Sequence, residues 1–235
     1  MNLLLLSNST NAGEDYLSYA KPYIKNFLGS KAKRLLFIPY AGVTIGWDEY
    51  SERVSEKFAD IGYTIYPIHK ENNLQGALNN AEAIVTGGGN TFNLLYHLQK
   101  NKIIPVIRNK VLSGIPYIGW SAGSNVTCPT IRTTNDMPVI EPNNFNAFNL
   151  IPFQINPHYT DANPNGHAGE TRQMRIEEFI ELNPDIYVAG LREGTAFQLI
   201  DKNLCLLGSK SVRIFKKGIS SYELTNKNNL DFLIK

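Results

Sequence analysis

Short apolar runs alternate with segments of helical periodicity along the first half of the chain. The runs have the length of buried strands, and the segments between them repeat their apolar residues with the period of an amphipathic helix. This alternation predicts an α/β protein with a mostly parallel sheet covered by helices on both faces. The expected strands are residues 3–6, 35–39, 63–68, 83–86 and 116–119, and the expected helices are residues 16–28, 47–61, 74–80, 90–99 and 104–112.

The second half of the chain has a different pattern. Residues 129–164 are rich in proline and asparagine and show little periodicity, and an irregular segment of this kind inside a compact domain usually has a function. Helical periodicity returns over residues 171–182, and a strand is expected at 186–189. We find no repeat or linker, so residues 1–235 are expected to form a single α/β domain. Four short apolar runs predict a C-terminal antiparallel meander, at residues 197–200, 204–207, 212–215 and 221–224.

The composition is that of a globular protein. Of the 235 residues, 43% are hydrophobic and 19% are charged, and the formal net charge is +2. This balance gives no reason to expect nucleic acid or a membrane as a partner. The apolar start of the chain is too short for a signal-peptide core, and Cys128 and Cys205 lack the spacing of a metal site. We therefore expect a cytoplasmic protein without a bound metal, and the sequence leaves its oligomeric state open between a monomer and a weak dimer.

A Gly-x-Ser-x-Gly motif carries the clearest chemical signal. It lies between an expected strand and an expected helix, as Gly119-Trp120-Ser121-Ala122-Gly123. A serine on such a turn projects its hydroxyl as a nucleophile, and the N–H of Ala122 is placed to stabilise an oxyanion. Small residues at a tight turn also occur for steric reasons alone. The motif therefore gains its meaning from partners elsewhere in the chain.

A serine nucleophile requires a base, and the chain contains 4 histidines. His97 lies within an expected helix and His69 in a polar loop, and neither has a motif around it. His158 follows a short apolar run in the irregular region, where a loop can carry it over the carboxyl edge of the sheet. His167 lies between flexible glycines, which suit a fixed imidazole less well. We expect His158 to be the base and keep His167 as the alternative.

The third member of a triad is a carboxylate that orients the imidazole and stabilises its protonated form. Glu193 follows an expected strand, and so lies at the sheet edge where the ligand sites of open α/β folds gather. Asp136 lies in the irregular stretch between the serine and the histidine. Each also has an ordinary interpretation, as a turn former for Asp136 and a solvated loop residue for Glu193. The residue pattern leaves both candidates open.

Consecutive glycines separate another expected strand from its helix, as Gly87-Gly88-Gly89 before Asn90. Glycines at a helix start let backbone N–H groups approach a bound anion closely. The lysine of a P-loop and the spacing of a dinucleotide-binding motif are both absent. We expect Gly88 and Gly89 to supply the second oxyanion donor beside Ala122, with a tight turn of no further role as the alternative.

Six segments spread over nearly the whole chain match one known family in sequence and in order. They are residues 4–9, 37–43, 87–92, 118–123, 130–138 and 154–158. On these segments the chain resembles the dipeptidase E family, aspartyl dipeptidases that are serine peptidases with a class I glutamine amidotransferase-like fold. By position, Ser121 corresponds to the family nucleophile and His158 to its base. Both positions to which the family's acid has been assigned are carboxylates here, Asp136 and Glu193.

The resemblance implies hydrolysis of short peptides, chiefly dipeptides, that begin with aspartate, without a metal or an organic cofactor. An acidic first residue requires a cation in its pocket, because a desolvated carboxylate left unpaired costs several kcal/mol. Arg132 and Arg172 are the candidates, since arginine can bind a carboxylate through two parallel hydrogen bonds. Asn90 is a further substrate-binding candidate. Ser124 departs from the family pattern, in which alanine is expected.

Two other functions are compatible with the same residues. One is a hydrolase of this architecture that acts on another acyl group, such as a cyanophycinase-like enzyme or an esterase. The other is a non-catalytic domain that binds an amino acid or an acidic peptide as a sensor. A sensor has no need of a serine nucleophile with its base and acid, so the enzyme is the favoured interpretation.

Overall fold

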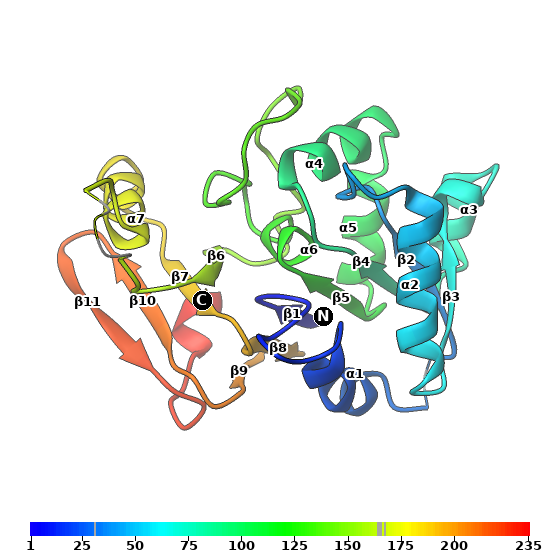
Figure 1. Cartoon of the computed structure of the whole chain (residues 1–235), viewed down its shortest axis with the longest axis horizontal. Coiled ribbons are helices and arrows are strands. Elements are labelled where there is room, and N and C mark those ends of the chain that lie inside the picture. The colour runs from blue at the N-terminus through cyan, green and yellow to red at the C-terminus, as the bar shows by residue number, and fades with distance from the viewer. Residues whose placement is uncertain (31, 164–165, 167) are drawn as a thin grey trace.

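A seven-stranded sheet forms the centre of the molecule (Figure 1). The structure is a computed structural model that describes residues 1–30, 32–163, 166 and 168–235. Strands β1 to β5 run parallel, and the antiparallel strands β8 and β9 extend the sheet beyond β1, in the order β3-β2-β4-β5-β1-β8-β9. The strands are β1 (Asn2–Leu6), β2 (Arg34–Ile38), β3 (Thr64–Pro67), β4 (Ala83–Thr86), β5 (Tyr117–Trp120), β8 (Ala196–Ile200) and β9 (Asn203–Leu207).

Neighbouring residues of a strand point to opposite faces of the sheet. Since both faces are apolar here, helices cover both of them. In β1, Leu3 and Leu5 pack on one face with α3, α4, α5 and α6, whereas Leu4 and Leu6 pack on the other with α1 and α2. No helix within the described residues is long and apolar enough to cross a membrane. The helices are α1 (Lys21–Leu28), α2 (Trp47–Ala59), α3 (Leu74–Asn79), α4 (Thr91–Lys100), α5 (Ile104–Leu112) and α6 (Ala122–Asn125), with short 3-10 helices at Ser18–Ala20, Ile68–Lys70 and Asp231–Ile234.

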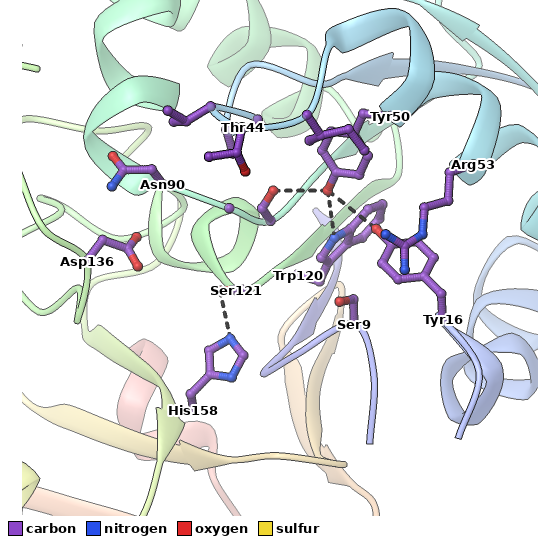
Figure 2. Close-up of a pocket in the computed structure, with 16 residues that line it drawn as sticks. Ser9, Tyr16, Thr44, Tyr50, Arg53, Asn90, Trp120, Ser121, Asp136 and His158 are labelled. Atoms are coloured by element: carbon purple, nitrogen blue, oxygen red, sulfur yellow. Dashed lines mark hydrogen bonds between the residues drawn. The ribbon is translucent and has the colours of Figure 1, made fainter. Parts of the chain in front are cut away.

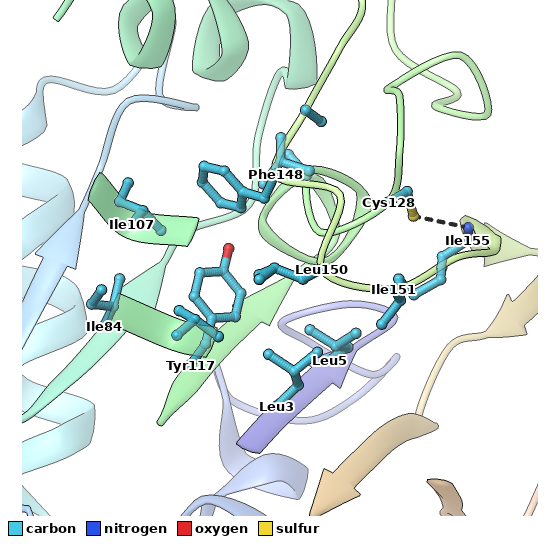
Figure 3. Close-up of a cluster of buried hydrophobic side chains, with 14 of the residues drawn as sticks. Leu3, Leu5, Ile84, Ile107, Tyr117, Cys128, Phe148, Leu150, Ile151 and Ile155 are labelled. Atoms are coloured by element: carbon cyan, nitrogen blue, oxygen red, sulfur yellow. Dashed lines mark hydrogen bonds between the residues drawn. The ribbon is translucent and has the colours of Figure 1, made fainter. Parts of the chain in front are cut away.

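The irregular stretch that follows α6 is anchored in the core (Figure 3). Phe148 packs edge-on against Tyr117 of β5, with ring centroids 5.9 Å apart, and its backbone N–H donates to the carbonyl of Val126 at 2.8 Å. The Tyr117 hydroxyl in turn donates to the carbonyl of Gly123 at 2.7 Å. This stretch therefore supports the strand and the turn that carry Ser121.

Four further strands form a smaller sheet beside the first, in the order β11-β10-β7-β6. Strands β6 and β7 are parallel, and the other pairs are antiparallel. Helix α7 (Arg172–Leu182) covers this sheet by packing Ile176 and Ile180 against Val188 and Phe215. The strands are β6 (Gln154–Tyr159), β7 (Val188–Arg192), β10 (Val212–Lys216) and β11 (Ile219–Leu224).

The predicted α/β class, the mostly parallel sheet and the antiparallel C-terminal strands are confirmed, and the structure adds how those strands are distributed. They divide between the sheets: β8 and β9 pair beside β1, whose edge would otherwise lack a partner, whereas β10 and β11 extend β7. The expectation that His158 lies on a loop was wrong, because residues 154–159 form β6. Gln154 and Asn156 of this strand are buried and hydrogen-bonded rather than facing solvent, and Pro157 lies inside it, which argues against a strand in the sequence.

Candidate active site

Ser121 lies on the turn between β5 and α6 in a conformation that is unfavourable for a residue with a side chain. Its backbone angles are φ 52° and ψ −111°, and such strain costs about 1–3 kcal/mol. Hydrogen bonds on both sides hold the turn: the Ser121 N–H donates to Leu6 O at 3.1 Å, and its carbonyl accepts from the N–H groups of Ser124 and Asn125 at 3.0 and 2.9 Å. The serine side chain is thereby directed into a cavity (Figure 2).

Both glycines of the motif are required by close packing. A Cβ on Gly119 would lie 2.3 Å from Gly123 O, and one on Gly123 would lie 2.2 Å from Thr86 O. Ser124, which departs from the family pattern, is buried with its hydroxyl 2.7 Å from Leu6 O and 2.9 Å from Gly119 O. Its hydroxyl thus supports the same turn.

The serine, a histidine and a glutamate form a continuous chain of hydrogen bonds. Nε2 of His158 lies 2.9 Å from Ser121 Oγ, and Nδ1 of the same ring lies 2.7 Å from Glu193 Oε1. A carboxylate at Nδ1 keeps the proton on that nitrogen and leaves Nε2 free to accept from the serine hydroxyl. The histidine and glutamate side chains are 37% and 48% exposed, so the pair is open to solvent.

A bulge in β6 directs His158 toward the serine. His158 has φ 54°, and the pairing of β6 with β7 shifts register between Asn156 and Tyr159. Its backbone N–H donates to Ser7 Oγ at 2.9 Å, and the Ser7 hydroxyl donates to Leu191 O at 2.7 Å. Sequence reasoning gave Ser7 no role, although the segment that contains it was part of the resemblance.

Charged residues beside Glu193 hold the ends of β6 and β7 together. Arg192 donates two hydrogen bonds to the Glu223 carboxylate, at 2.7 and 2.8 Å, and one to Asp161 Oδ2 at 2.5 Å. Arg213 donates to the other oxygen of Asp161 at 3.0 Å. The hydrogen bonds from Arg192 lower the pKa of Glu223. Burial raises the pKa of Asp161, but its contacts with the two arginines outweigh burial, so the pKa of Asp161 is lowered overall.

Asp136, the other candidate acid, has different partners. Its Oδ2 accepts hydrogen bonds from the N–H and the hydroxyl of Thr91, at 2.8 and 2.6 Å, and from the Thr134 hydroxyl at 3.0 Å. It therefore satisfies the N-terminus of α4. Asp136 lines the Ser121 cavity, but its hydrogen bonds within the described ranges do not include one to His158.

The residues predicted for the oxyanion hole lie beside Ser121. A Cβ on Gly88 would lie 3.1 Å from Ser121 Cβ, so this backbone packs directly on the serine. Gly89 has φ 129°, and a Cβ there would lie 2.4 Å from Ala41 O. Among the described residues, the N–H groups of Gly88, Gly89 and Ala122 have no backbone acceptor. They are therefore available to an anion.

Tyr50 on α2 fixes the orientation of the Gly88–Gly89 peptide. Its hydroxyl donates to Gly88 O at 3.0 Å and accepts from Trp120 Nε1 at 3.2 Å, as Figure 2 shows. Because the C=O and N–H of a trans peptide point in opposite directions, this bond directs the Gly89 N–H away from Tyr50. Burial raises the pKa of Tyr50 to about 12. Sequence reasoning missed Tyr50, because a helical pattern does not show what a tyrosine hydroxyl binds.

The cavity around Ser121 has a volume of about 560 Å³. Asn90 and Asp136 lie on one side of the serine and Arg53 on the other (Figure 2). The Asn90 side chain accepts from the Asn93 N–H at 3.0 Å and donates to a loop carbonyl at 2.8 Å, so it caps α4 as it lines the cavity. Arg53 was not among the predicted site residues.

The two predicted arginines share one cavity of about 210 Å³ beside Asp136 and differ in their other neighbours. Arg172 begins α7 and lines a neighbouring cavity of about 790 Å³ together with His158 and Glu193. Arg132 also lines a cavity that does not include Arg172, and it donates to Asn183 Oδ1 at 3.2 Å. The structure thus places Arg172 beside His158 and Glu193, and neither arginine lines the Ser121 cavity itself.

Two expectations concern residues or groups that this site does not include. His167, the alternative base, lies outside the described residues. Within residues 1–30, 32–163, 166 and 168–235, no cluster of three or more His, Cys, Asp or Glu side chains is arranged to hold a metal ion.

The comparison with known proteins decides the family. Residues 3–207 match the family model of Peptidase family S51. The chain belongs to this family. A protein named peptidase E from Nostoc sp. is 55% identical over 233 residues, which cover 99% of this chain and 96% of that protein. Peptidase E from Salmonella typhimurium is 46% identical over 218 residues, which cover 93% and 95%.

Solved structures agree with the S51 assignment. A candidate peptidase E from Listeria monocytogenes has a TM-score of 0.66 at 25% identity, over 89% of this chain and 98% of that one. A peptidase from an acI-B1 Actinobacterium has the same fold, with a TM-score of 0.72 at 18% identity over 97% and 96% of the two chains. The predicted family is confirmed, and the chain is a member of a peptidase family.

Proposed function

We propose that this chain is a serine dipeptidase that hydrolyses short peptides with an N-terminal aspartate. The observation that carries the proposal is the chain of hydrogen bonds from Ser121 Oγ through His158 to Glu193, at 2.9 and 2.7 Å. A nucleophile, a base within reach of it, and a carboxylate on the far side of the base are the parts that acyl transfer requires.

The proposed reaction proceeds through an acyl-enzyme. Nε2 of His158 accepts the proton of the Ser121 hydroxyl as Oγ attacks the carbonyl carbon of the peptide bond. The tetrahedral intermediate then breaks its C–N bond, and the imidazolium gives its proton to the departing amine. Water attacks the ester, passing one proton to Nε2 and from there to Oγ, and the N-terminal residue leaves with a free carboxylate.

The oxyanion of both intermediates is assigned to backbone donors. The N–H groups of Ala122, Gly88 and Gly89 lie beside the serine without a backbone acceptor among the described residues, which supports this assignment. Donors fixed in advance stabilise the developing negative charge without reorganising during the reaction. The strained serine turn and the tyrosine behind the Gly88 carbonyl both serve this arrangement.

Glu193 is the proposed acid of the triad. It contacts His158 directly, whereas one carboxylate oxygen of Asp136 accepts hydrogen bonds from Thr91 at the start of α4. The remaining oxygen of Asp136 gives the cavity an anionic wall, which suits the α-ammonium group of an unblocked peptide. Asp136 is therefore assigned to substrate binding, beside Asn90.

Arg172 is the proposed partner of the aspartate side chain. It is half-buried beside His158 and Glu193, and burial is the main cause that lowers its pKa, while the charge of Asp136 raises it. A guanidinium that is partly withdrawn from water gains more from a bound carboxylate than a fully solvated one does. Arg132 is not part of the proposal because its guanidinium binds Asn183 instead.

A panel of dipeptides tests this function. Asp-Leu, Asn-Leu, Glu-Leu and Leu-Leu are incubated with the purified protein, and the released amine is measured. We expect Asp-Leu to be the preferred substrate. The Arg172→Met variant should show a smaller preference for Asp-Leu over Asn-Leu than the wild type. Ser121→Ala should reduce turnover by at least about 10³-fold, as the loss of a triad member does.

Ser9→Ala is the matched control, since Ser9 presents a hydroxyl to the same cavity outside the hydrogen-bond chain. It should retain wild-type turnover. Turnover by Ser121→Ala at a rate close to wild type would exclude the serine mechanism. A protein that cleaves none of the panel would not have the proposed activity.

A further inference from the structure

Arg53 is the only arginine or lysine among the described residues that line the Ser121 cavity. It lies on α2, in the wall opposite Asp136, with Ser121 between the two (Figure 2). The cavity therefore has an anionic wall on one side of the serine and a cationic wall on the other. The reaction proposed above gives Asp136 a task but leaves Arg53 without one.

The guanidinium of Arg53 is held by an aromatic ring. Its Cζ lies 4.3 Å from the centroid of Tyr16, and the Tyr16 ring packs edge-on against Trp120, the residue before the serine. The Tyr16 hydroxyl lies 3.4 Å from that of Tyr50. Contact with an aromatic face restricts the arginine side chain while its N–H edge stays available for hydrogen bonds.

Arg53 has no acidic partner within the described part of the chain, although α2 offers two. Glu49 and Glu56 lie one helical turn before and after it, where arginine commonly pairs with an acid. The acid of this helix that forms ion pairs is Asp48, which binds His69 and Lys70. The charge of Arg53 is therefore directed to the cavity wall and is not neutralised by its own helix.

We propose that Arg53 binds the C-terminal carboxylate of the peptide, on the side of the residue that leaves as the amine. This inference rests on the proposed function. A dipeptide carries its ammonium group on one side of the scissile bond and its free carboxylate on the other, which matches Asp136 and Arg53 on either side of Ser121. A planar guanidinium can receive that carboxylate through two parallel hydrogen bonds.

A contact of this kind also predicts a limit on the length of the substrate. In a longer peptide, the atom that reaches Arg53 is a neutral peptide carbonyl, and the charged carboxylate lies further along. Such a peptide forms a weaker hydrogen bond with the arginine, because bonds to ionised groups are about twice as strong as bonds between neutral ones. Arg53 thus favours dipeptides over longer peptides because it binds the C-terminal carboxylate.

The test compares Asp-Leu with Asp-Leu amide, which differ only in the charge at the C-terminus. The wild-type protein should prefer the free acid in kcat/KM by about 10- to 100-fold, the worth of hydrogen bonds to a charged group. Arg53→Met should lose this preference by slowing the free acid alone, while its turnover of the amide stays at the wild-type level. Arg53→Lys keeps the charge without the planar fork and should retain part of the preference.

Lys57→Met is the control, because Lys57 is on the same helix one turn further along and does not line the cavity. It should keep the wild-type preference. An Arg53→Met protein that still favours the free acid, or that loses both substrates equally, would overturn the inference. So would a wild-type protein that cleaves acid and amide equally well. A wild-type protein that cleaves neither would instead remove the proposed function, and this inference with it.

Discussion

Replacing Glu193 by glutamine tests how much a partly exposed carboxylate stabilises the protonated form of His158. The change keeps the shape of the side chain and removes the charge that stabilises the imidazolium. Two unit charges about 4 Å apart interact by about 1 kcal/mol in water and about 4 kcal/mol near a protein surface. The Glu193 and His158 side chains are 48% and 37% exposed. The interaction energy of the carboxylate with the imidazolium should therefore fall within this range rather than approach that of a buried pair.

We therefore expect Glu193→Gln to lower kcat by about 10- to 400-fold, as a loss of about 1.5–3.5 kcal/mol implies. This is less than the roughly 10⁴-fold loss known for a buried triad acid. KM should change little, because the histidine and its acid act on the transition state in every substrate complex. Steady-state kinetics with Asp-Leu over a range of concentrations separate the two parameters.

Asp136→Asn is the matched variant, since it makes the same change at the other candidate. The amide oxygen can still accept from the Thr91 N–H, so α4 keeps its N-terminal hydrogen bond. We expect a raised KM with a kcat near that of the wild type. The reverse pattern, in which kcat collapses for Asp136→Asn and stays nearly normal for Glu193→Gln, would refute the assignment of the acid.

Two further predictions concern the surroundings of the site. Tyr50→Phe should lower kcat by up to about 10²-fold with little effect on KM, because the Gly89 N–H loses its fixed direction and an oxyanion donor contributes at least that much. Tyr63→Phe, which removes a hydroxyl bonded to the distant Gly29 carbonyl at 2.9 Å, should leave kcat unchanged, and an equal effect of both would contradict this reasoning. The lowered pKa values of Asp161 and Glu223 predict an acid-sensitive contribution to stability. It is fully present above the unfolded-state values of about 3.9 and 4.3 and is lost as the pH falls through the lower folded-state values. Arg192→Met should therefore flatten the fall of Tm below about pH 4, and an unchanged slope would show that the cluster is not its source.

Local features of the site could be predicted from the sequence because their causes are local. The two glycines around Ser121 are required by atoms within the same turn or on the adjacent strand, so the motif alone indicates the geometry. The glycines before α4 differ, because a Cβ on Gly88 would meet Trp120 and one on Gly89 would meet Ala41, which lie far away in the sequence. His158 could be selected because the chain contains few histidines. Its position on a strand could not be predicted, since Pro157 lies inside β6 and argues against a strand there.

Features that depend on distant parts of the chain could not be predicted in this way. The periodicity of α2 shows that Tyr50 faces the sheet, but not that its hydroxyl reaches a carbonyl 38 positions away. Arg53 lies three positions further on, and only the packing of Tyr16 from the N-terminal segment shows where its guanidinium points. The choice between Asp136 and Glu193 likewise depends on which loop reaches the Nδ1 atom of His158.

The proposed nucleophile belongs to one sheet, whereas the proposed base and its acid belong to the other. Ser121 follows β5 of the central sheet, and His158 and Glu193 lie on β6 and just after β7 of the smaller sheet. Catalytic competence is consequently a property of how the two sheets are docked, since a displacement of about 1 Å between reacting groups can cost about 10²-fold in rate. Ser7, at the end of β1, bonds to both β6 and β7 across this boundary. Ile155 and Leu191 of the smaller sheet lie in one hydrophobic cluster with Leu5 of β1, so the two sheets share a core. Mild heat or denaturant that loosens this shared core should therefore stop the reaction by moving the sheets apart.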